Sequence, residues 1–213
     1  MLAIFGNLVT GVPMTLILTF GALLIGVVLG VPICMARQSR HGVLSRLAAA
    51  LIVAIRSVPP LVWLFLVYFG LGSGILRMSP LVAALSGLGL ITAVNMAEIY
   101  RGSLAAIHSG QWEASQALGL PRWSRLVEII GPQVARISLP AVATYAIGLL
   151  KDSAVASIIG VPELAFRGTY LSQQTFKGLE IFMAVGLLYI AMSLPVAWAS
   201  RVVDARIRLR VAK

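Results

Sequence analysis

Long apolar runs separated by shorter polar stretches dominate this 213-residue chain. A helix needs about 20 predominantly apolar residues to cross the hydrocarbon core of a bilayer. We predict five such spans, at approximately residues 10–35, 47–71, 80–99, 137–159 and 179–200. The pattern therefore predicts an all-α integral membrane protein with about five transmembrane helices, built as a single domain over residues 1–213.

The composition favours a membrane protein over a soluble one. Hydrophobic residues make up 59% of the chain and charged residues 11%, with a mean hydropathy of +0.96. Soluble domains are about half apolar and about a quarter charged. The formal net charge of +10 does not indicate a nucleic-acid partner, because the positive charge gathers in three places between or after the apolar runs.

The basic residues predict the orientation of the chain. One set follows the first, third and fifth spans and consists of Arg37, Arg40, Arg46, Arg101, Arg122, Arg125, Arg136, Arg201, Arg206, Arg208, Arg210 and Lys213. The opposite side carries only Arg77, Arg167 and Lys177. Because Lys and Arg accumulate in cytoplasmic loops, we expect the N-terminus outside the cell and the C-terminus in the cytoplasm.

The same orientation places the polar, helix-prone segment 101–136 in the cytoplasm, the side where ATP is available. Ser109 is the expected N-cap of a short helix. Gly119, followed by Pro121, is the expected end of that helix. A long structured loop of this kind indicates a docking site.

The side-chain pattern of the 109–120 helix also supports a docking site. Trp112, Ser115 and Gly119 are spaced by three and four residues, so they predict a face of mostly small side chains that another protein could approach closely. The alternative is an amphipathic helix on the lipid surface. Such a helix usually carries several basic residues on its polar face, and 109–120 has none.

Prolines predict three irregular points in the helices, because proline lacks the backbone N–H donor. Residues 59–60 predict a kink or a break in the second span, and a break would expose backbone to an aqueous path. A second loop helix is expected over 122–130, ended by Gly131-Pro132 before the fourth span. Pro195 is expected to interrupt the fifth span.

Two kinds of small residue predict packing contacts. Gly87 and Gly89 in the third span favour close approach of a neighbouring helix. Cys34, the single cysteine, lies in an apolar stretch and is expected to pack as a small buried side chain without a disulfide partner.

Six short segments, in order along the chain, resemble the permeases of ABC importers, and within them the polar amino-acid uptake branch. These are 56–61 (RSVPPL), 97–102 (AEIYRG), 110–114 (GQWEA), 117–119 (ALG) with Pro132-Gln133, 150–153 (LKDS) and 162–164 (PEL). The order Glu113-Ala114-Ser115, Gly119 and 137–140 resembles the EAA loop of that family.

This resemblance implies the type I ABC-importer transmembrane fold, in which the EAA loop is the docking site of the ATP-hydrolysing subunit. The coupling residues it implies are Gln111, Glu113, Ala114, Ala117 and Gly119. The implied partners are two ATP-binding subunits that hold Mg-ATP, a second permease subunit (identical or homologous), an extracytoplasmic solute-binding protein and the lipid of a bacterial inner membrane. This chain itself is expected to bind no cofactor.

Some positions depart from the family pattern. Val94-Asn95-Met96, Thr144 and Ser153-Ala154-Val155 stand where the family commonly has a tyrosine, an asparagine and Thr-Ser-Leu. These differences lie in or near the spans and leave the substrate open. Basic, acidic and amide amino acids, or derivatives such as opines, all fit.

Charged residues within the spans are the candidates for the pathway or gate. They are Arg56, Glu98, Lys151 and Asp152, to which the Pro59 break is added. A charge facing lipid at mid-bilayer costs at least about 2.5 kcal/mol. These groups are therefore expected to pair with one another near an interface or to line an aqueous path, and Glu98 and Arg101, three residues apart, are placed for a local pair.

No catalytic pattern is present in the sequence. It has no G-x-x-x-x-G-K-[S/T] phosphate loop, no clustered metal ligands and no nucleophile–base set, so we expect neither ATP hydrolysis nor another enzymatic reaction in this chain. An ion-coupled carrier or channel working alone is one alternative, but it gives no reason for the 101–136 loop. A membrane-embedded enzyme is another, but it needs a catalytic cluster.

Overall fold

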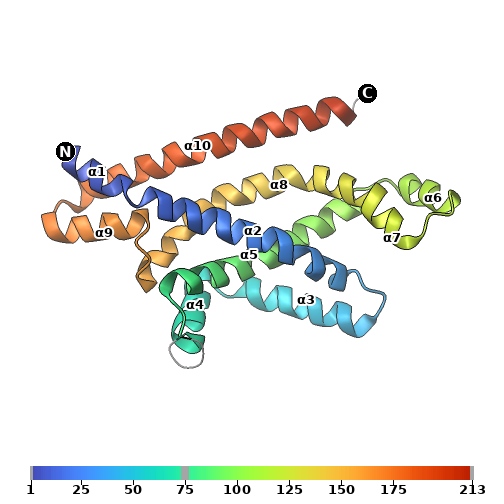
Figure 1. The fold of residues 1–213 in the computed structure, drawn as a ribbon, viewed down its shortest axis with the longest axis horizontal. Helices are drawn as coiled ribbons and strands as arrows, with labels where there is room; N and C mark the ends of the chain where they lie inside the picture. Colours follow the sequence, from blue (N-terminus) through green and yellow to red (C-terminus); the bar gives the residue numbers. More distant parts are fainter. Residues whose placement is uncertain (1, 73–76, 212–213) are drawn as a thin grey trace.

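The computed structural model describes residues 2–72 and 77–211, and within these ranges the chain forms helices and no strands (Figure 1). The α-helices are α1 (Leu2–Val9), α2 (Val12–Arg37), α3 (Gly42–Ser57), α4 (Pro60–Phe65), α5 (Pro80–Ala105), α6 (Ser109–Ala117), α7 (Arg122–Ser124), α8 (Gly131–Asp152), α9 (Leu164–Thr175) and α10 (Gly178–Val211). Short π-helical turns follow α4 and α7, over Leu66–Leu71 and Arg125–Ile130, and a 3-10 helix over Ser153–Ile159 follows α8.

In the part of the chain that the structure describes, four helical stretches are long and apolar enough to cross a membrane: Phe5–Arg37, Pro80–Ala105, Arg122–Ile159 and Gly178–Ala199. A fifth span results if the bent pair Gly42–Ser57 and Pro60–Leu71 is counted as one. The first and third predicted spans match the observed helices closely. The fifth predicted span also matches, since its bounds differ by one residue at each end, and only the interruption predicted at Pro195 is wrong. The second and fourth predicted spans need correction.

The second predicted span is not one straight helix. α3 ends at Ser57, and the chain turns by 102° before α4 starts at Pro60. Val58 is extended, at φ −106° and ψ 132°, as expected for a residue that precedes proline. The two prolines therefore cause a break and not a mild kink.

The break predicted at Gly131-Pro132 is wrong, because helical structure continues from Arg122 to Ile159. The helix accommodates Pro132 because the turn before it is a wider π-helical turn. In this turn the Gly131 N–H donates to the carbonyl of Leu126, five residues earlier. Pro132 then occupies the first turn of α8, where a missing N–H costs little. Pro195 likewise lies inside α10 without ending it.

α2 and α5 form the centre of the fold and pack directly against each other (Figure 1). The prediction for Gly89 is confirmed, since a Cβ there would lie 2.7 Å from Ile25 Cγ2. Sequence reasoning missed two more glycines on the α2 side of this contact. A Cβ on Gly26 would overlap Thr92, and one on Gly30 would lie 2.6 Å from Met96 Cβ.

Replacing Gly26 with alanine is expected to destabilise the fold. Its Cβ would lie 2.9 Å from the backbone carbonyl carbon of Thr92, and overpacking of this kind costs about 1–3 kcal/mol. The matched control is Gly148→Ala in α8, where a Cβ meets nothing within 4 Å. Thermal unfolding in detergent should give a lower midpoint for Gly26→Ala only; equal midpoints would contradict tight α2–α5 packing.

The buried side chains that the structure describes form three clusters. The largest surrounds Leu18, Leu64 and Leu88, and a second joins Cys34, Ile52 and Val94, so the predicted burial of Cys34 (4% exposed) is confirmed. The third cluster ties α1, α9 and α10 together at the opposite end of the molecule from α6 and α7 (Figure 1). Many large apolar side chains on α2 remain exposed, as expected for a surface that faces lipid.

Candidate functional sites in the α6 loop and the spans

The α6 segment projects at one end of the molecule, together with α7 (Figure 1). α6 begins at Ser109, but its N-cap is His108, not Ser109 as the sequence suggested. The Nδ1 atom of His108 accepts a hydrogen bond of 3.1 Å from the Gly110 N–H. Residue type alone favoured serine, because histidine is not among the preferred N-cap residues.

Gly119 ends this helix, as predicted. Its φ is +69°, in the left-handed region that glycine adopts without a Cβ penalty. A Cβ at this position would meet nothing within 4 Å. The glycine is thus required by the backbone of the turn, and the space around it is open.

The face of α6 that was predicted to receive another protein is the inner face. Ser115 is 1% exposed and Trp112 is half-buried, so these two residues pack against the chain itself. The predicted coupling residues, Gln111, Glu113, Ala114, Ala117 and Gly119, are exposed on the remaining surface of α6 and at its end. The structure thus separates these residues from Trp112 and Ser115, which face inward.

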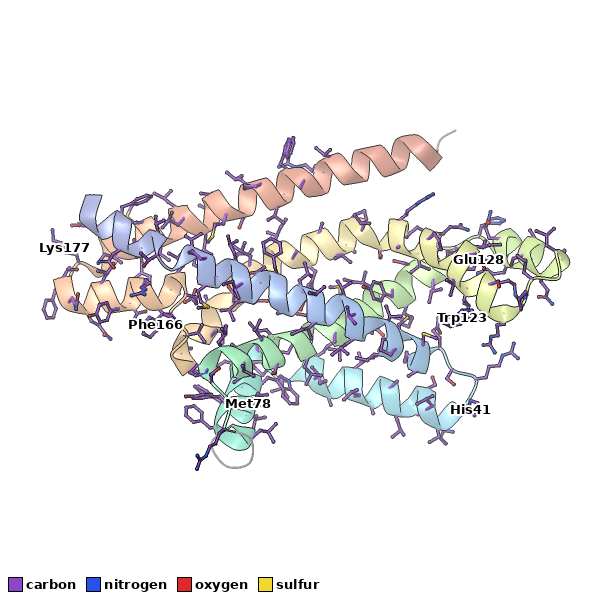
Figure 2. The ribbon with its side chains drawn as sticks, viewed as in Figure 1. His41, Met78, Trp123, Glu128, Phe166 and Lys177 are labelled. Atoms are coloured by element: carbon purple, nitrogen blue, oxygen red, sulfur yellow. The ribbon has the colours of Figure 1, made fainter. Side chains whose placement is uncertain are left out.

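Two exposed apolar side chains next to this surface were not singled out from the sequence. Leu118 is 73% exposed and Trp123 is 67% exposed, and Figure 2 shows Trp123 at the α7 end of the molecule. Large exposed apolar side chains in a polar loop commonly mark an interaction surface. Gln133 fixes the position of the loop, since its Nε2 donates to Gln111 Oε1 at 3.1 Å.

An open pocket of about 610 Å³ lies between α3, α5 and α8. Its lining consists of Arg56, Asn95, Glu98, Ile99, Ala141, Thr144 and Tyr145. The structure therefore brings together two of the predicted pathway residues, Arg56 and Glu98, from different helices. The lining places a cation, a carboxylate, an amide and two hydroxyl groups around one space.

The predicted local pair of Glu98 and Arg101 is confirmed. Arg101 Nη2 donates to Glu98 Oε2 at 2.8 Å, and Arg101 Nε lies 3.1 Å from Glu98 Oε1. The two side chains are 23% and 42% exposed, so this pair is a partly solvated contact within one helix. Glu98 both pairs with Arg101 and lines the pocket.

Tyr145 is a polar pocket residue that sequence reasoning missed. Its hydroxyl donates to Thr92 Oγ1 at 3.4 Å and so joins α8 to α5. The available signal was the polar dipeptide Thr144-Tyr145 inside an apolar span. Nothing in the local sequence tells which helix such a dipeptide faces.

The remaining pathway candidates lie elsewhere. Lys151 and Asp152 are exposed at the end of α8, and neither belongs to the two ion pairs formed by the described side chains. Lys151 lines a smaller pocket of about 250 Å³ beside Tyr189 of α10. Pro59 stands at the break between α3 and α4.

A buried carboxyl group connects the helices at the other end of the molecule. Glu163 is 0% exposed. It caps α9 by accepting from the Phe166 N–H at 2.7 Å, and it accepts from the hydroxyl groups of Tyr189 at 2.8 Å and Thr15 at 3.4 Å. Burial raises the pKa of the Glu163 carboxyl, and these hydrogen bonds oppose the shift. The 162–164 segment thus joins α2, α9 and α10.

The described side chains contain no group of three or more His, Cys, Asp or Glu residues that could hold a metal ion. Most of the residues predicted from the sequence to serve function lie on the exposed surface of α6 or in the polar pocket between the spans. Apolar spans, a polar helical loop and an open polar pocket together define a membrane transport subunit.

The chain belongs to the family of inner membrane components of binding-protein-dependent transport systems, whose model matches residues 22–209. Members of this family are the membrane-spanning permease subunits of ABC importers. Each permease works with a separate ATPase and a binding protein. The chain is 36% identical over 188 residues to a probable amino-acid ABC transporter permease of Bacillus subtilis (strain 168), YckA, covering 88% of this chain and 83% of that one.

Two further relatives are named for the substrates of their transport systems. The chain is 32% identical to the nopaline permease NocM of Agrobacterium fabrum (91% and 84% covered) and 32% identical to the glutamine permease GlnP of Escherichia coli (strain K12; 95% and 93% covered).

Solved structures support the same family. A structure described as an amino acid ABC transporter with histidines superposes with a TM-score of 0.87 at 30% identity, covering 94% of each chain. The inward-facing MetNI methionine transporter, at 24% identity and a TM-score of 0.80, shares the fold. The predicted type I importer fold is thereby confirmed.

Proposed function

We propose that this permease subunit carries a polar amino acid, or an amino-acid derivative such as an opine, through the pocket between α3, α5 and α8. The observation that carries the proposal is the lining of that pocket. Arg56 supplies a cation for an α-carboxylate, and Glu98 supplies an anion for an α-ammonium group. Asn95, Thr144 and Tyr145 add hydrogen-bonding groups. Similarity to amino-acid and nopaline permeases supports the same substrate class.

The α6 surface is the proposed docking site for the ATPase subunit. Glu113 would make a polar contact, Ala114 and Ala117 would fill a groove, and Gly119 would allow close approach because its surroundings are open. Leu118 and Trp123 would add apolar contact area. Mg-ATP would be held by the ATPase, and this chain would bind no cofactor of its own.

The proposed assembly contains two permease subunits, identical or homologous, with two ATPase subunits and one extracytoplasmic binding protein. Lys151 and Asp152 support a second permease. Both are exposed within the apolar 122–159 region, where lipid would be a costly neighbour for a charge. A facing subunit, or an aqueous path between two subunits, would supply partners for them.

The proposed orientation has the N-terminus outside and the C-terminus in the cytoplasm. The 38–41 turn, α6 with α7, and the end of α10 all lie toward one end of the molecule, and α1 and α9 lie toward the other (Figure 1). The three basic segments of the sequence thus gather at one end, as the positive-inside rule requires of a cytoplasmic face.

Transport would proceed by alternating access. Closure of the ATPase dimer on ATP would move α6, and α6 would transmit the motion through the continuous 122–159 helix, which contributes Ala141, Thr144 and Tyr145 to the pocket. One continuous helical stretch thus runs from beside the proposed docking surface to the proposed solute site.

The substrate class can be tested with the complete transporter, including its binding protein, reconstituted in liposomes. A panel of labelled basic, acidic and amide amino acids, an opine and a sugar is offered with ATP inside the vesicles. We expect ATP-dependent uptake of one or a few amino-acid-like solutes and none of the sugar. Uptake of the sugar alone, or uptake without ATP, would contradict the proposal.

A further inference from the structure

A third pocket, of about 890 Å³, lies between the end of α2, the α2–α3 turn and the loop segment that contains α6 and α7. Its polar lining includes Arg40 and His41 from the turn and Arg122 and Arg125 from the loop. Figure 2 shows His41 and Trp123 toward the same end of the molecule. Two segments that are about 80 residues apart in the sequence therefore bring their basic side chains to one space.

The charge of this pocket is uncompensated. Among the described residues, its lining contains three arginines and no Asp or Glu. None of the three belongs to the ion pairs formed by the described side chains. The Nε atom of Arg125 is buried and has no hydrogen-bond partner among the described residues. A buried guanidinium N–H without an acceptor is unfavourable, and a phosphate offers oxygens in the geometry that arginine binds best.

The rest of the lining is apolar and lies at the ends of the spans. Met35 is in the last turn of α2, Leu104 is in the last turn of α5, and Leu44 is in the first turn of α3. Met35 and Leu44 are 52% and 46% exposed. The pocket thus combines basic side chains with apolar side chains from the ends of the spans, and the end of a span is where a bilayer changes from acyl chains to headgroups.

We propose that this pocket binds the phosphodiester headgroup of an anionic phospholipid from the cytoplasmic leaflet, with its acyl chains along Met35 and Leu44. This proposal rests on the proposed orientation and docking surface. Basic pockets between spans on the cytoplasmic side are suited to such headgroups. The lipid would tie the α6–α7 loop to the α2–α3 turn, and so would hold the docking surface in place.

The ATPase does not compete for the same surface in this arrangement. α6 contributes Trp112 and Gln116 to the pocket, whereas Glu113, Ala114 and Ala117 do not line it and remain exposed. One helix would therefore contact lipid on one side and the ATPase on the other.

The test uses the transporter purified with its partner subunits in nanodiscs of phosphatidylcholine and phosphatidylglycerol. After exchange into phosphatidylcholine alone, the retained phosphatidylglycerol is counted by mass spectrometry, without ATP or substrate. Arg122→Gln with Arg125→Gln should lower the retained lipid by on the order of tenfold or more, because each basic side chain near an anionic headgroup contributes about a fivefold increase in affinity. Arg40→Gln alone should give a smaller loss.

The matched control is Arg46→Gln with Arg136→Gln, which removes the same charge from two exposed arginines outside the pocket lining and should retain wild-type lipid. Equal retention in the pocket and control variants would overturn the proposal, as would displacement of the lipid by millimolar inorganic phosphate. Since the readout involves neither uptake nor ATP hydrolysis, a failure here leaves the transport function untouched. Gel filtration would reveal a folding defect in the Arg122→Gln, Arg125→Gln variant. In that case the lipid retained by Arg40→Gln tests the proposal, and retention equal to the wild type would overturn it.

Discussion

Glu113→Lys is expected to lower ATP-driven uptake strongly while leaving the chain folded and inserted in the membrane. Glu113 is exposed on α6 and forms no ion pair among the described side chains, so reversal of its charge disturbs nothing within the chain. At a docked interface, loss of one partner of a hydrogen-bonded charge pair costs about 2–5 kcal/mol. Uptake and substrate-stimulated ATPase activity in liposomes should both fall by on the order of 30-fold or more.

Glu128→Lys is the matched control for this change. Glu128 is also exposed, lies in the π-helical turn after α7 and belongs to the same loop (Figure 2), but it is outside the α6 surface. The variant should transport at close to the wild-type rate. Normal substrate-stimulated ATPase activity in Glu113→Lys would contradict the assignment of α6 as the docking site.

Glu98→Gln is expected to reduce uptake by on the order of 10- to 100-fold, because it removes the only carboxylate of the pocket lining, and hydrogen bonds to charged groups contribute about 1.5–3 kcal/mol. Its folded yield in detergent should stay near that of the wild type. The pair that it breaks with Arg101 is partly exposed, and such pairs contribute about 1 kcal/mol or less.

Arg101→Gln separates the two roles of Glu98. It removes the same ion pair but changes no pocket residue, since Arg101 is not part of the lining. Uptake by Arg101→Gln should fall only slightly. If both variants lost uptake equally, Glu98 would act through its pair with Arg101, and the proposed contact with the solute would be wrong.

Local sequence determined much of this architecture. Apolar runs located the spans because bilayer thickness fixes the length of a crossing helix. The Glu98–Arg101 pair followed from their spacing on one helix. Gly119 could be predicted as the end of α6, because glycine adopts positive φ more readily than other residues.

Features that depend on the neighbours of a helix were harder to predict. Trp112 and Ser115 share a face of α6, but their sequence does not tell whether that face meets this chain or another. Tyr145 becomes a pocket residue only because α8 packs beside α5. A π-helical turn accommodates Gly131-Pro132, and α10 continues past Pro195, whereas proline content alone predicted interruptions at both places.

Co-purification of the tagged chain from mild detergent tests the central claim most directly. If the chain is a permease docked through α6, mass spectrometry should find an ATPase with a G-x-x-x-x-G-K-[S/T] motif in the same complex. The same sample should distinguish a second copy of this chain from a homologous permease. Recovery of the chain alone, folded and transporting in liposomes without ATP, would contradict the account and favour an independent carrier.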